Sequence, residues 1–307
     1  MTMVSTGPIS LGGNATSGGL NQSVNIELGR SATASINMNE SAVRTLAGVA
    51  SGAISMSNFY GKANQFAFTI SSNQTNANLR TLAVNAGWNQ SSKVAATIAG
   101  GVIISSNGTG TPALTISGSF PGGVDLINNG VIVGMGGAGG KGATSYIPQG
   151  PGAPGGAGGL ALSVSTTVSI NNGSGTIAGG GGGGGGGANY DSKAYGNGGG
   201  GGGGGGRSSN AANSAAGAGG TGLPSGSGGA AGTYSSAGSG GNGGSAGGAV
   251  AGRGGDGGGW GSAGATGSNT NVGNYWGPGA GGAGGGAISG NSNVTWVAFG
   301  TRLGAIT

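Results

Sequence analysis

The sequence contains no cysteine and no histidine among its 307 residues. Their absence excludes disulfide bonds, thiol nucleophiles, zinc sites built on these ligands and imidazole acid–base chemistry. Charged residues are also scarce, at 5% of the chain, against about 25% in ordinary soluble domains. The five acidic residues lie far apart in the sequence, so paired-carboxylate chemistry has no support. We therefore predict that the protein is not an enzyme, has no catalytic residues and holds no cofactor or metal.

The ten lysine and arginine residues give a formal net charge of +5, but they are scattered along the chain. Nucleic-acid-binding proteins gather their basic residues on one surface, so we expect no nucleic-acid partner. No apolar run is long enough for a transmembrane helix. The first residues, "MTMVSTGPISLGG", lack the basic and apolar regions of a secretion signal. We expect synthesis in a host cytoplasm and release by another route, such as cell lysis.

Glycine accounts for 86 residues, and most of them fall between residues 134 and 290. Two uninterrupted runs of glycine occupy 179–187 and 198–206. Elsewhere in this region other residues recur at every third position, as Met135, Ala138 and Lys141 do in "GMGGAGGKG". Three residues per turn is the period of polyproline-II and polyglycine-II helices. The period therefore indicates ordered helices of this kind.

A polyglycine-II helix has no internal hydrogen bonds, so its backbone groups must bond to neighbouring chains. The close approach that this requires leaves no room for a Cβ atom, which explains the glycine. We predict a bundle of antiparallel polyglycine-II helices over 134–290. A collagen triple helix would need an unbroken triplet register and abundant proline, and the chain has eight prolines. A flexible linker is the other alternative to the bundle.

Residues 1–62 have ordinary composition and are predicted to form a small α+β module. The stretches 23–29 and 32–38 alternate apolar and polar residues, which is typical of half-buried strands. A short helix is predicted over 39–49, with Asn39 as its N-cap and Gly48 near its end. Residues 52–62 are predicted to form another strand.

Residues 63–133 are predicted to form a β-rich platform. A strand is expected at 65–70 and a short helix at 76–88, closed by Gly87. Further β-rich pieces then recur about every ten residues, which favours a sheet or a short β-solenoid. The terminal segment 291–307 is predicted to be a strand that returns to this platform. The predicted fold class is thus mainly β and irregular, with a small α+β N-terminal module, a β-rich platform and a polyglycine-II bundle.

Aromatic residues of the glycine-rich region lie between the glycine segments, where the turns of a bundle would be. Counting antiparallel helices places 143–149 and 188–197 at one end and 207–216 at the other. These side chains could pack back onto the loop ends, or they could form a binding surface, because tyrosine and tryptophan on loops of a rigid scaffold resemble a paratope. We favour binding, and the candidate receptor-binding residues are Tyr146, Tyr190, Tyr195, Tyr234, Trp260, Tyr275 and Trp276.

Three stretches carry a resemblance to a known family: "LINNGVIVGMGGAGGKG" at 126–142, "VSINNGSGTIAGGGGGGGGG" at 168–187 and "VTWVAFGTRLGAIT" at 294–307. They resemble the tip adhesins of T-even-like bacteriophage long tail fibres, over roughly 95–307. The resemblance implies a bundle of packed polyglycine-II helices whose distal loops contact outer-membrane proteins or surface glycans of Gram-negative bacteria. It also implies a place on the virion, at the tip of a tail or fibre.

The N-terminal residues depart from that family. "MVSTGPISLGG" through "SGAISMSNFYGK" resembles instead a module found in phage tail and other virion proteins. This resemblance implies that residues 1–62 attach the protein to other virion tail proteins, and a homo-oligomer is possible. The leading hypothesis is a phage receptor-binding protein. The alternatives are a structural virion protein, such as a head fibre or tail decoration, and an ice-binding protein, against which the bulky loops argue.

Overall fold

The computed structural model describes the chain apart from five short stretches and three single positions, covering 3–13, 16–17, 20–62, 64–90, 92–145, 149–192, 196–273 and 275–307. The chain divides into two compact units. The first comprises residues 1–68, 83–96 and 119–125, and the second comprises 69–82, 97–118 and 126–307. Within the described ranges no helix has the length and apolar character needed to cross a membrane.

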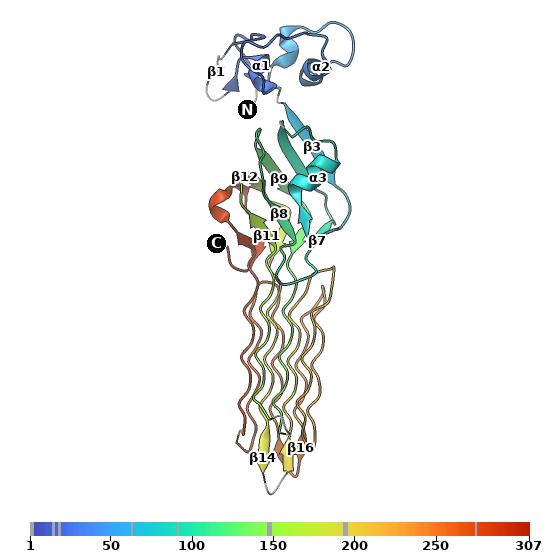
Figure 1. The fold of residues 1–307 in the computed structure, drawn as a ribbon, viewed down its shortest axis with the longest axis vertical. Helices are drawn as coiled ribbons and strands as arrows, with labels where there is room; N and C mark the ends of the chain where they lie inside the picture. Colours follow the sequence, from blue (N-terminus) through green and yellow to red (C-terminus); the bar gives the residue numbers. More distant parts are fainter. Residues whose placement is uncertain are drawn as a thin grey trace. The chain divides into compact units, whose positions relative to one another are not determined.

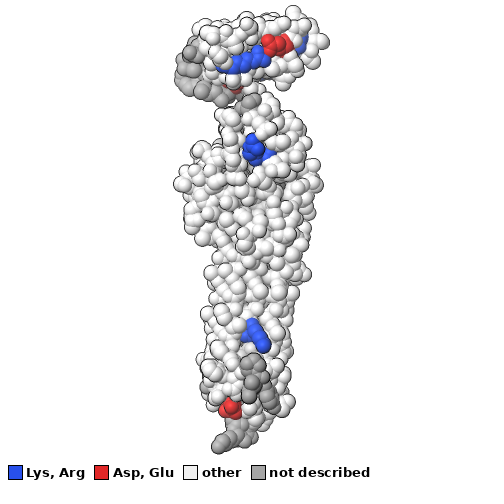
Figure 2. All heavy atoms as spheres, viewed as in Figure 1, with Lys and Arg blue, Asp and Glu red and all other residues white. Residues whose placement is uncertain are grey.

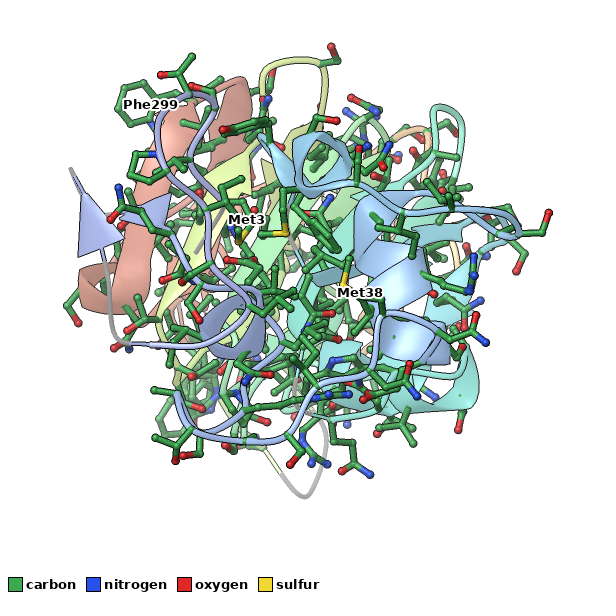
Figure 3. All side chains as sticks on the ribbon, turned by 90° about the horizontal axis from the view of Figure 1, so that it is seen from above. Met3, Met38 and Phe299 are labelled. Atoms are coloured by element: carbon green, nitrogen blue, oxygen red, sulfur yellow. The ribbon has the colours of Figure 1, made fainter. Side chains whose placement is uncertain are left out.

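The first unit is built from short elements around a small core. They are a hairpin of β1 (Thr16–Ser17) and β2 (Leu20–Asn21), the helices α1 (Val24–Glu27) and α2 (Ser41–Ala47), and the 3-10 helix η1 (Met56–Phe59). Helix α2 ends at Gly48, whose φ of 72° is the left-handed conformation that glycine adopts most easily. The core includes Met3, Leu46 and Phe59, with Met38 packed against it (Figure 3).

The strands predicted in this unit at 23–29, 32–38 and 52–62 are wrong. The first stretch contains α1, the second is irregular and the third contains η1. Half-buried and exposed residues do alternate through the second stretch, but its backbone has no partner strand among the residues that the structure describes. An extended chain crossing a small core therefore produces the same alternation as a strand. The N-cap of α2 is Glu40, one residue after the predicted Asn39, and its side chain makes no capping hydrogen bond.

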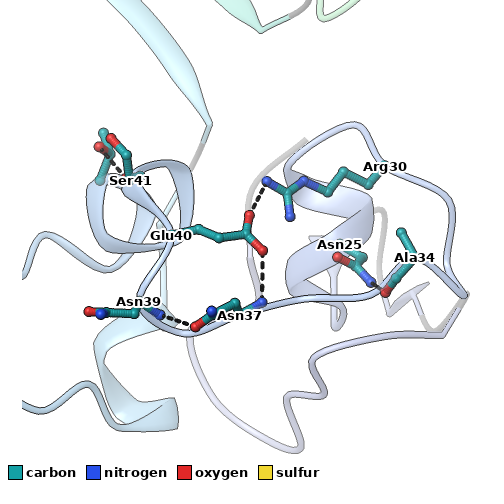
Figure 4. A network of polar contacts seen from close by, with 8 residues as sticks. Asn25, Arg30, Ala34, Asn37, Asn39, Glu40 and Ser41 are labelled. Carbon is teal, nitrogen blue, oxygen red and sulfur yellow. Dashed lines mark hydrogen bonds and ion pairs between the residues drawn. The ribbon is translucent and has the colours of Figure 1, made fainter.

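Polar side chains hold the irregular segment between α1 and α2 in place (Figure 4). The Arg30 guanidinium lies 2.5 Å from a carboxylate oxygen of Glu40, whose other oxygen accepts from the Asn37 N–H at 2.8 Å. The hydrogen bond from Arg30 and that from Asn37 hold the pKa of the Glu40 carboxyl below its usual value. From α1, the Asn25 amide donates to the Ala34 carbonyl at 2.7 Å. These bonds replace a strand ladder in this segment.

Three parallel β-sheets form a solenoid, the name used below for all three together. The first sheet contains β4 (Gln74–Thr75), β7 (Ile103–Ser105), β10 (Val131–Val133), β13 (Thr176–Ala178) and β20 (Thr301–Leu303). The second contains β5 (Ala77–Asn78), β8 (Leu114–Ile116), β11 (Leu162–Val164) and β18 (Ile288–Ser289). The third contains β3 (Gln65–Ile70), β6 (Lys93–Ile98), β9 (Val124–Asn128), β12 (Val168–Asn171) and β19 (Val294–Ala298). The boundary between the two compact units falls within strands β3, β6 and β9.

Along the chain, successive solenoid strands fall in the third, the first and the second sheet, and this order then repeats. Each full turn of the solenoid, called a coil below, therefore adds one strand to each sheet. Side chains of β8 and β12 alternate between buried and half-buried, which places one face of each strand in the core. The predicted strand at 65–70 is β3, and the predicted helix at 76–88 is the shorter α3 (Leu79–Asn85), followed by Gly87 with a φ of 103°. Repeated β-pieces at ten-residue spacing are thus successive solenoid strands.

The glycine-rich segments are two long insertions in this solenoid. One occupies 134–161, between β10 and β11, and the other occupies 179–287, between β13 and β18. Both leave the first sheet and return to the second, so both begin and end at the same corner of the solenoid. Figure 1 shows the insertions as extended segments that run side by side away from the solenoid strands. We call these two insertions the glycine bundle.

Hydrogen bonds within the glycine bundle repeat every third residue. Gly134, Gly137 and Gly140 donate their N–H groups to the carbonyls of residues 178, 181 and 184, respectively, at 2.8–2.9 Å. In the run 179–187, residues three apart donate to the same neighbour, and the neighbours reached in this way are 153–159, 201–207 and 262–265, while Gly179 donates to the Leu303 carbonyl. Three further segments donate to its carbonyls: 137–143, 255–261 and 279–285. The run is therefore bonded on every side.

The second nine-glycine run is enclosed in the same way. Residues of 198–206 donate to 224–230, 137–143 and 252–255, and accept from 184–187, 217–220 and 238–244. A Cβ atom added at any glycine of either run would lie within 3.0 Å of a neighbouring segment's atoms. In outer segments every third residue can carry a side chain, as the exposed Ala138 and Lys141 do. The two nine-glycine runs, called the inner runs below, thus require glycine at every position.

Asparagines form a buried ladder where the chain turns from the third sheet to the first. Asn128 Nδ2 donates to Asn172 Oδ1 at 2.7 Å, and Asn172 Nδ2 donates to the Phe299 and Thr301 carbonyls at 2.8 and 3.2 Å. Both asparagines have no exposed surface. The ladder joins three successive coils at one corner and ends at Phe299, which takes the place of a further asparagine.

We expect Asn172→Ala to lower the free energy of unfolding by about 2 kcal/mol, because it removes the 2.7 Å acceptor of the Asn128 amide and the side-chain donor to the Phe299 and Thr301 carbonyls. Chemical denaturation of the full chain, followed by circular dichroism, measures the change. Asn171→Ala is the matched control, since Asn171 is half-buried and its Oδ1 accepts only from the nearby Gly173 N–H among the bonds described. Equal destabilisation by the two substitutions would contradict the role of the ladder.

Candidate functional site

Several turns of the glycine bundle meet at the end opposite the solenoid, where Figure 1 shows β14 (Tyr190–Ser192) and β16 (Ser245–Ala246). Backbone bridges connect Asn189 with Trp276 and Asn197 with Leu223. Ser145 also donates its N–H to the Thr221 carbonyl at 3.0 Å. We call this end the tip; it consists of the described residues among 144–150, 189–197, 221–225, 245–250 and 269–276.

Two hairpins and a hydrogen-bonded loop shape the tip. β14 pairs antiparallel with β15 (Gly196–Gly198), and β16 pairs antiparallel with β17 (Ala249–Val250). The side chain of Asn271 accepts from the Val250 N–H at 2.7 Å and donates to the Gly248 carbonyl at 2.8 Å. The loop around Asn271 is therefore fixed against the second hairpin.

Large apolar side chains are exposed at the tip. Among described residues, Leu223 is 68% exposed, Tyr275 50% and Trp276 38%, and Val250 and Val272 are also exposed. Exposed apolar residues that gather at one end of a rigid scaffold are characteristic of a binding surface. Few charged side chains are drawn on the glycine bundle in the face that Figure 2 shows. The tip therefore offers mainly apolar and hydrogen-bonding contacts.

Tyr275 and Trp276, which the sequence predicted as receptor-binding residues, form an exposed pair. Their rings meet edge to face, with centroids 5.8 Å apart. The Tyr275 hydroxyl lies 3.3 Å from the Gln149 side-chain oxygen, and the Trp276 N–H donates to Asn189 Oδ1 at 2.7 Å. Two aromatic side chains held in this way present a large contact area that is already ordered.

Tyr190 also lies at the tip, but its prediction as a contact residue needs correction. Its side chain is 1% exposed and forms a small core with Ala249 and Ala251. The ring lies so close to the backbone at Gly198 that a Cβ there would overlap it. Tyr190 thus packs the two hairpins together and has no accessible surface to offer a partner.

Tyr234 and Trp260 lie at the opposite end of the bundle, next to the solenoid. The Arg207 guanidinium carbon is 3.6 Å from the Trp260 ring centroid, and the two aromatic rings meet edge to face at 5.1 Å. Trp260 Nε1 donates to the Ser208 carbonyl at 3.1 Å. Burial raises the pKa of the Tyr234 hydroxyl, and the Arg207 charge opposes this shift. Both aromatics are half-buried and stabilise turns near the solenoid, away from the tip.

The remaining predicted residues, Tyr146 and Tyr195, lie outside the described residues. The structure adds Leu223, Val250 and Val272, which the aromatic criterion missed. Each is a large apolar residue in a stretch of small or polar ones, as in "TGLPS", "GGAVAG" and "NTNVGN". That contrast is the signal that could have found them. Within the described chain, no group of three or more acidic residues is placed to hold a metal ion.

A second exposed apolar group lies on the last coil of the solenoid and comprises Val297, Phe299, Leu303 and Ile306. Phe299, labelled in Figure 3, follows β19, and the Arg302 guanidinium lies 4.5 Å from its ring centroid. Trp296 on β19 is half-buried beside them, with Arg302 4.8 Å from its ring.

The chain thus combines a β-solenoid with a long glycine bundle whose tip exposes apolar side chains. The family model for the phage tail fibre adhesin Gp38 matches residues 65–307. The chain therefore belongs to the Gp38 family of phage tail fibre adhesins, and its place is the virion tail. Residues before 65 lie outside the family match.

A solved structure has the same fold: the gp37–gp38 adhesin tip complex of the bacteriophage S16 long tail fibre. It matches with a TM-score of 0.52 and 23% identity, over 86% of this chain and 91% of the other. The curated proteins gave no match. The predicted resemblance to tail fibre tip adhesins is confirmed by the family match.

Proposed function

We propose that this adhesin attaches the virion to the bacterial surface through the tip of its glycine bundle. The observation that carries the proposal is the exposed group of Leu223, Val250, Val272, Tyr275 and Trp276, gathered at the end of the bundle that points away from the solenoid. The partner is an outer-membrane protein or a surface glycan of a Gram-negative host. The role is attachment, without catalysis.

In this proposal the glycine segments are polyglycine-II helices. The support is the repetition of hydrogen bonds at every third residue and the bonding of each inner run to neighbours on all sides. Such a scaffold lacks a large apolar core, and its rigidity comes from bonds between backbones. Loops at its end are then held in fixed positions although they contain few large side chains.

Residues 1–62 are proposed to attach the protein to other tail proteins of the virion, and a homo-oligomer is compatible with that role. Two observations support this proposal: residues 1–62 form a small core of their own, and they lie outside the adhesin family match. The protein is proposed to be made in the host cytoplasm and released with the virion by lysis.

Binding of the purified full chain to whole cells tests the function. We expect saturable binding to cells of a strain that the phage infects, and competition with the adsorption of the phage itself. Cells of a strain that the phage does not adsorb to serve as the control. Absence of binding to the infected strain would favour a structural protein of the tail over an adhesin.

A further inference from the structure

We propose that Asn189 is the residue that positions the exposed Tyr275–Trp276 pair, by joining it to the inner glycine run 179–187. The inference rests on the receptor-binding function proposed above and assigns a role within that site. Asn189 itself has no exposed surface, so it acts through the aromatic pair and not by touching a receptor.

Three hydrogen bonds connect Asn189 to the pair. Its N–H donates to the Trp276 carbonyl at 3.2 Å, and its carbonyl accepts from the Tyr275 N–H at 3.0 Å. Its side-chain oxygen Oδ1 accepts from the Trp276 N–H at 2.7 Å. The first two bonds involve backbone groups that any residue could supply. Only the third depends on the asparagine side chain, and it fixes the backbone at Trp276.

The inner run gives Asn189 a fixed position. Ala188 precedes it and donates its N–H to the Ser268 carbonyl at 3.0 Å, while the run before Ala188 is bonded to neighbours on all sides. The aromatic pair is thereby attached to the most enclosed segment of the bundle. On the other side, the Tyr275 hydroxyl is within 3.3 Å of the Gln149 side-chain oxygen. An aromatic pair that is ordered before contact loses less conformational entropy on binding.

Buried polar atoms without hydrogen-bond partners at the tip indicate that the bonds between Asn189 and the aromatic pair do more than stabilise the fold. Among the described residues, Asn189 Nδ2 is buried without a hydrogen-bond partner, and so are the Tyr190 and Ser145 hydroxyls. Buried polar groups normally find partners, and their exceptions in native proteins often mark functional positions. Here the exceptions lie in the turns that hold the exposed aromatic pair. Stability alone would favour an apolar side chain at 189, whereas positioning Trp276 requires the acceptor.

The test compares Asn189→Ala with the wild type by two measurements on the full chain. Hydrogen exchange with mass spectrometry reports on the amides of 275–277 and, separately, on the run 179–187. Binding kinetics use outer-membrane vesicles from a strain that the wild-type protein binds. We expect Asn189→Ala to lose protection at 275–277, keep it in 179–187 and bind at least about tenfold more weakly, with an unchanged melting temperature.

Asn171→Ala is the matched control. Asn171 lies on the solenoid strand β12, away from the tip, and its Oδ1 accepts from the Gly173 N–H at 3.1 Å. This control is expected to keep both protection and binding. Equal effects of the two substitutions would overturn the assignment to Asn189.

The remaining outcomes separate the inference from the proposed function. Unchanged protection at 275–277 in Asn189→Ala would overturn the positioning role, whatever the binding result. Lost protection with unchanged binding would overturn the claim that this position serves receptor contact, while wild-type binding would still support an adhesin. Failure of the wild-type protein to bind any vesicles would overturn the proposed function, and the exchange measurement would still decide whether Asn189 holds the pair.

Discussion

Replacing Tyr275 and Trp276 together by alanine is expected to weaken binding to host cells by about 2–4 kcal/mol, or roughly 30- to 1000-fold in Kd. The two side chains are 50% and 38% exposed and meet edge to face, so they combine a large contact area with little freedom left to lose. Their backbone bonds to Asn189 do not depend on the rings and remain in the variant. The loss should therefore appear in binding and not in folding.

Phe299→Ala is the control for this prediction. Phe299 is also an exposed aromatic residue, at 57%, but it lies on the last coil of the solenoid and not at the tip. It should leave binding unchanged. Circular dichroism and thermal unfolding of both variants establish that they are folded. Wild-type binding by the double variant, or an equal loss in Phe299→Ala, would show that the tip pair is not the contact surface.

Gly183→Ala is expected to destabilise the protein by about 3 kcal/mol, because the inner run has no space for a methyl group. A Cβ at Gly183 would overlap the carbonyl oxygen of Ala138. The same residue donates to the Gly156 carbonyl at 2.8 Å and accepts from the Gly282 N–H at 2.7 Å, so a shift that relieves the overlap would strain bonds to other segments. Thermal unfolding of the full chain should show a fall in Tm of roughly 6–12 °C.

Gly259→Ala provides the comparison, because a Cβ at Gly259 meets nothing within 4 Å. Both substitutions exchange the same two residues in a glycine segment, so their effects on the unfolded chain are similar. The difference between them therefore measures the packing of the inner run. Similar melting temperatures for the two variants would mean that the inner glycines are not closely packed and would remove the main support for the polyglycine-II scaffold.

The N-terminal residues show how a sequence pattern can be misread. Alternation of apolar and polar residues over 23–38 predicted strands, whereas the structure has a four-residue helix and an irregular segment there. Period-two burial needs only an extended chain across a core, and a strand also needs a partner. Hydrogen-bond partners such as Glu40 for Arg30 lie ten residues away, and their pairing is decided by the packing of the unit.

For the tip, the sequence identified the loops but not the role of each aromatic residue. The glycine segments marked where turns must lie, and Tyr275 and Trp276 are exposed there. Tyr190 occupies such a turn but is buried against Ala249 and Ala251, residues about sixty positions later. Trp260 occupies a turn at the other end, beside Arg207. Exposure depends on which segments lie next to each other, and no local pattern contains that information.

The sequence by itself determined the three-residue period, the absence of cysteine and histidine chemistry, the recurring β-pieces and the family. These follow from composition and from local backbone preferences, which glycine runs and Asn-Gly turns express strongly. Only the tertiary structure decided that both glycine insertions leave one corner of a solenoid, and that the two nine-glycine runs are enclosed on every side. The reason is that the backbone groups of the two inner runs bond to segments that lie many residues away in the chain, so their partners are chosen by the packing of the whole bundle.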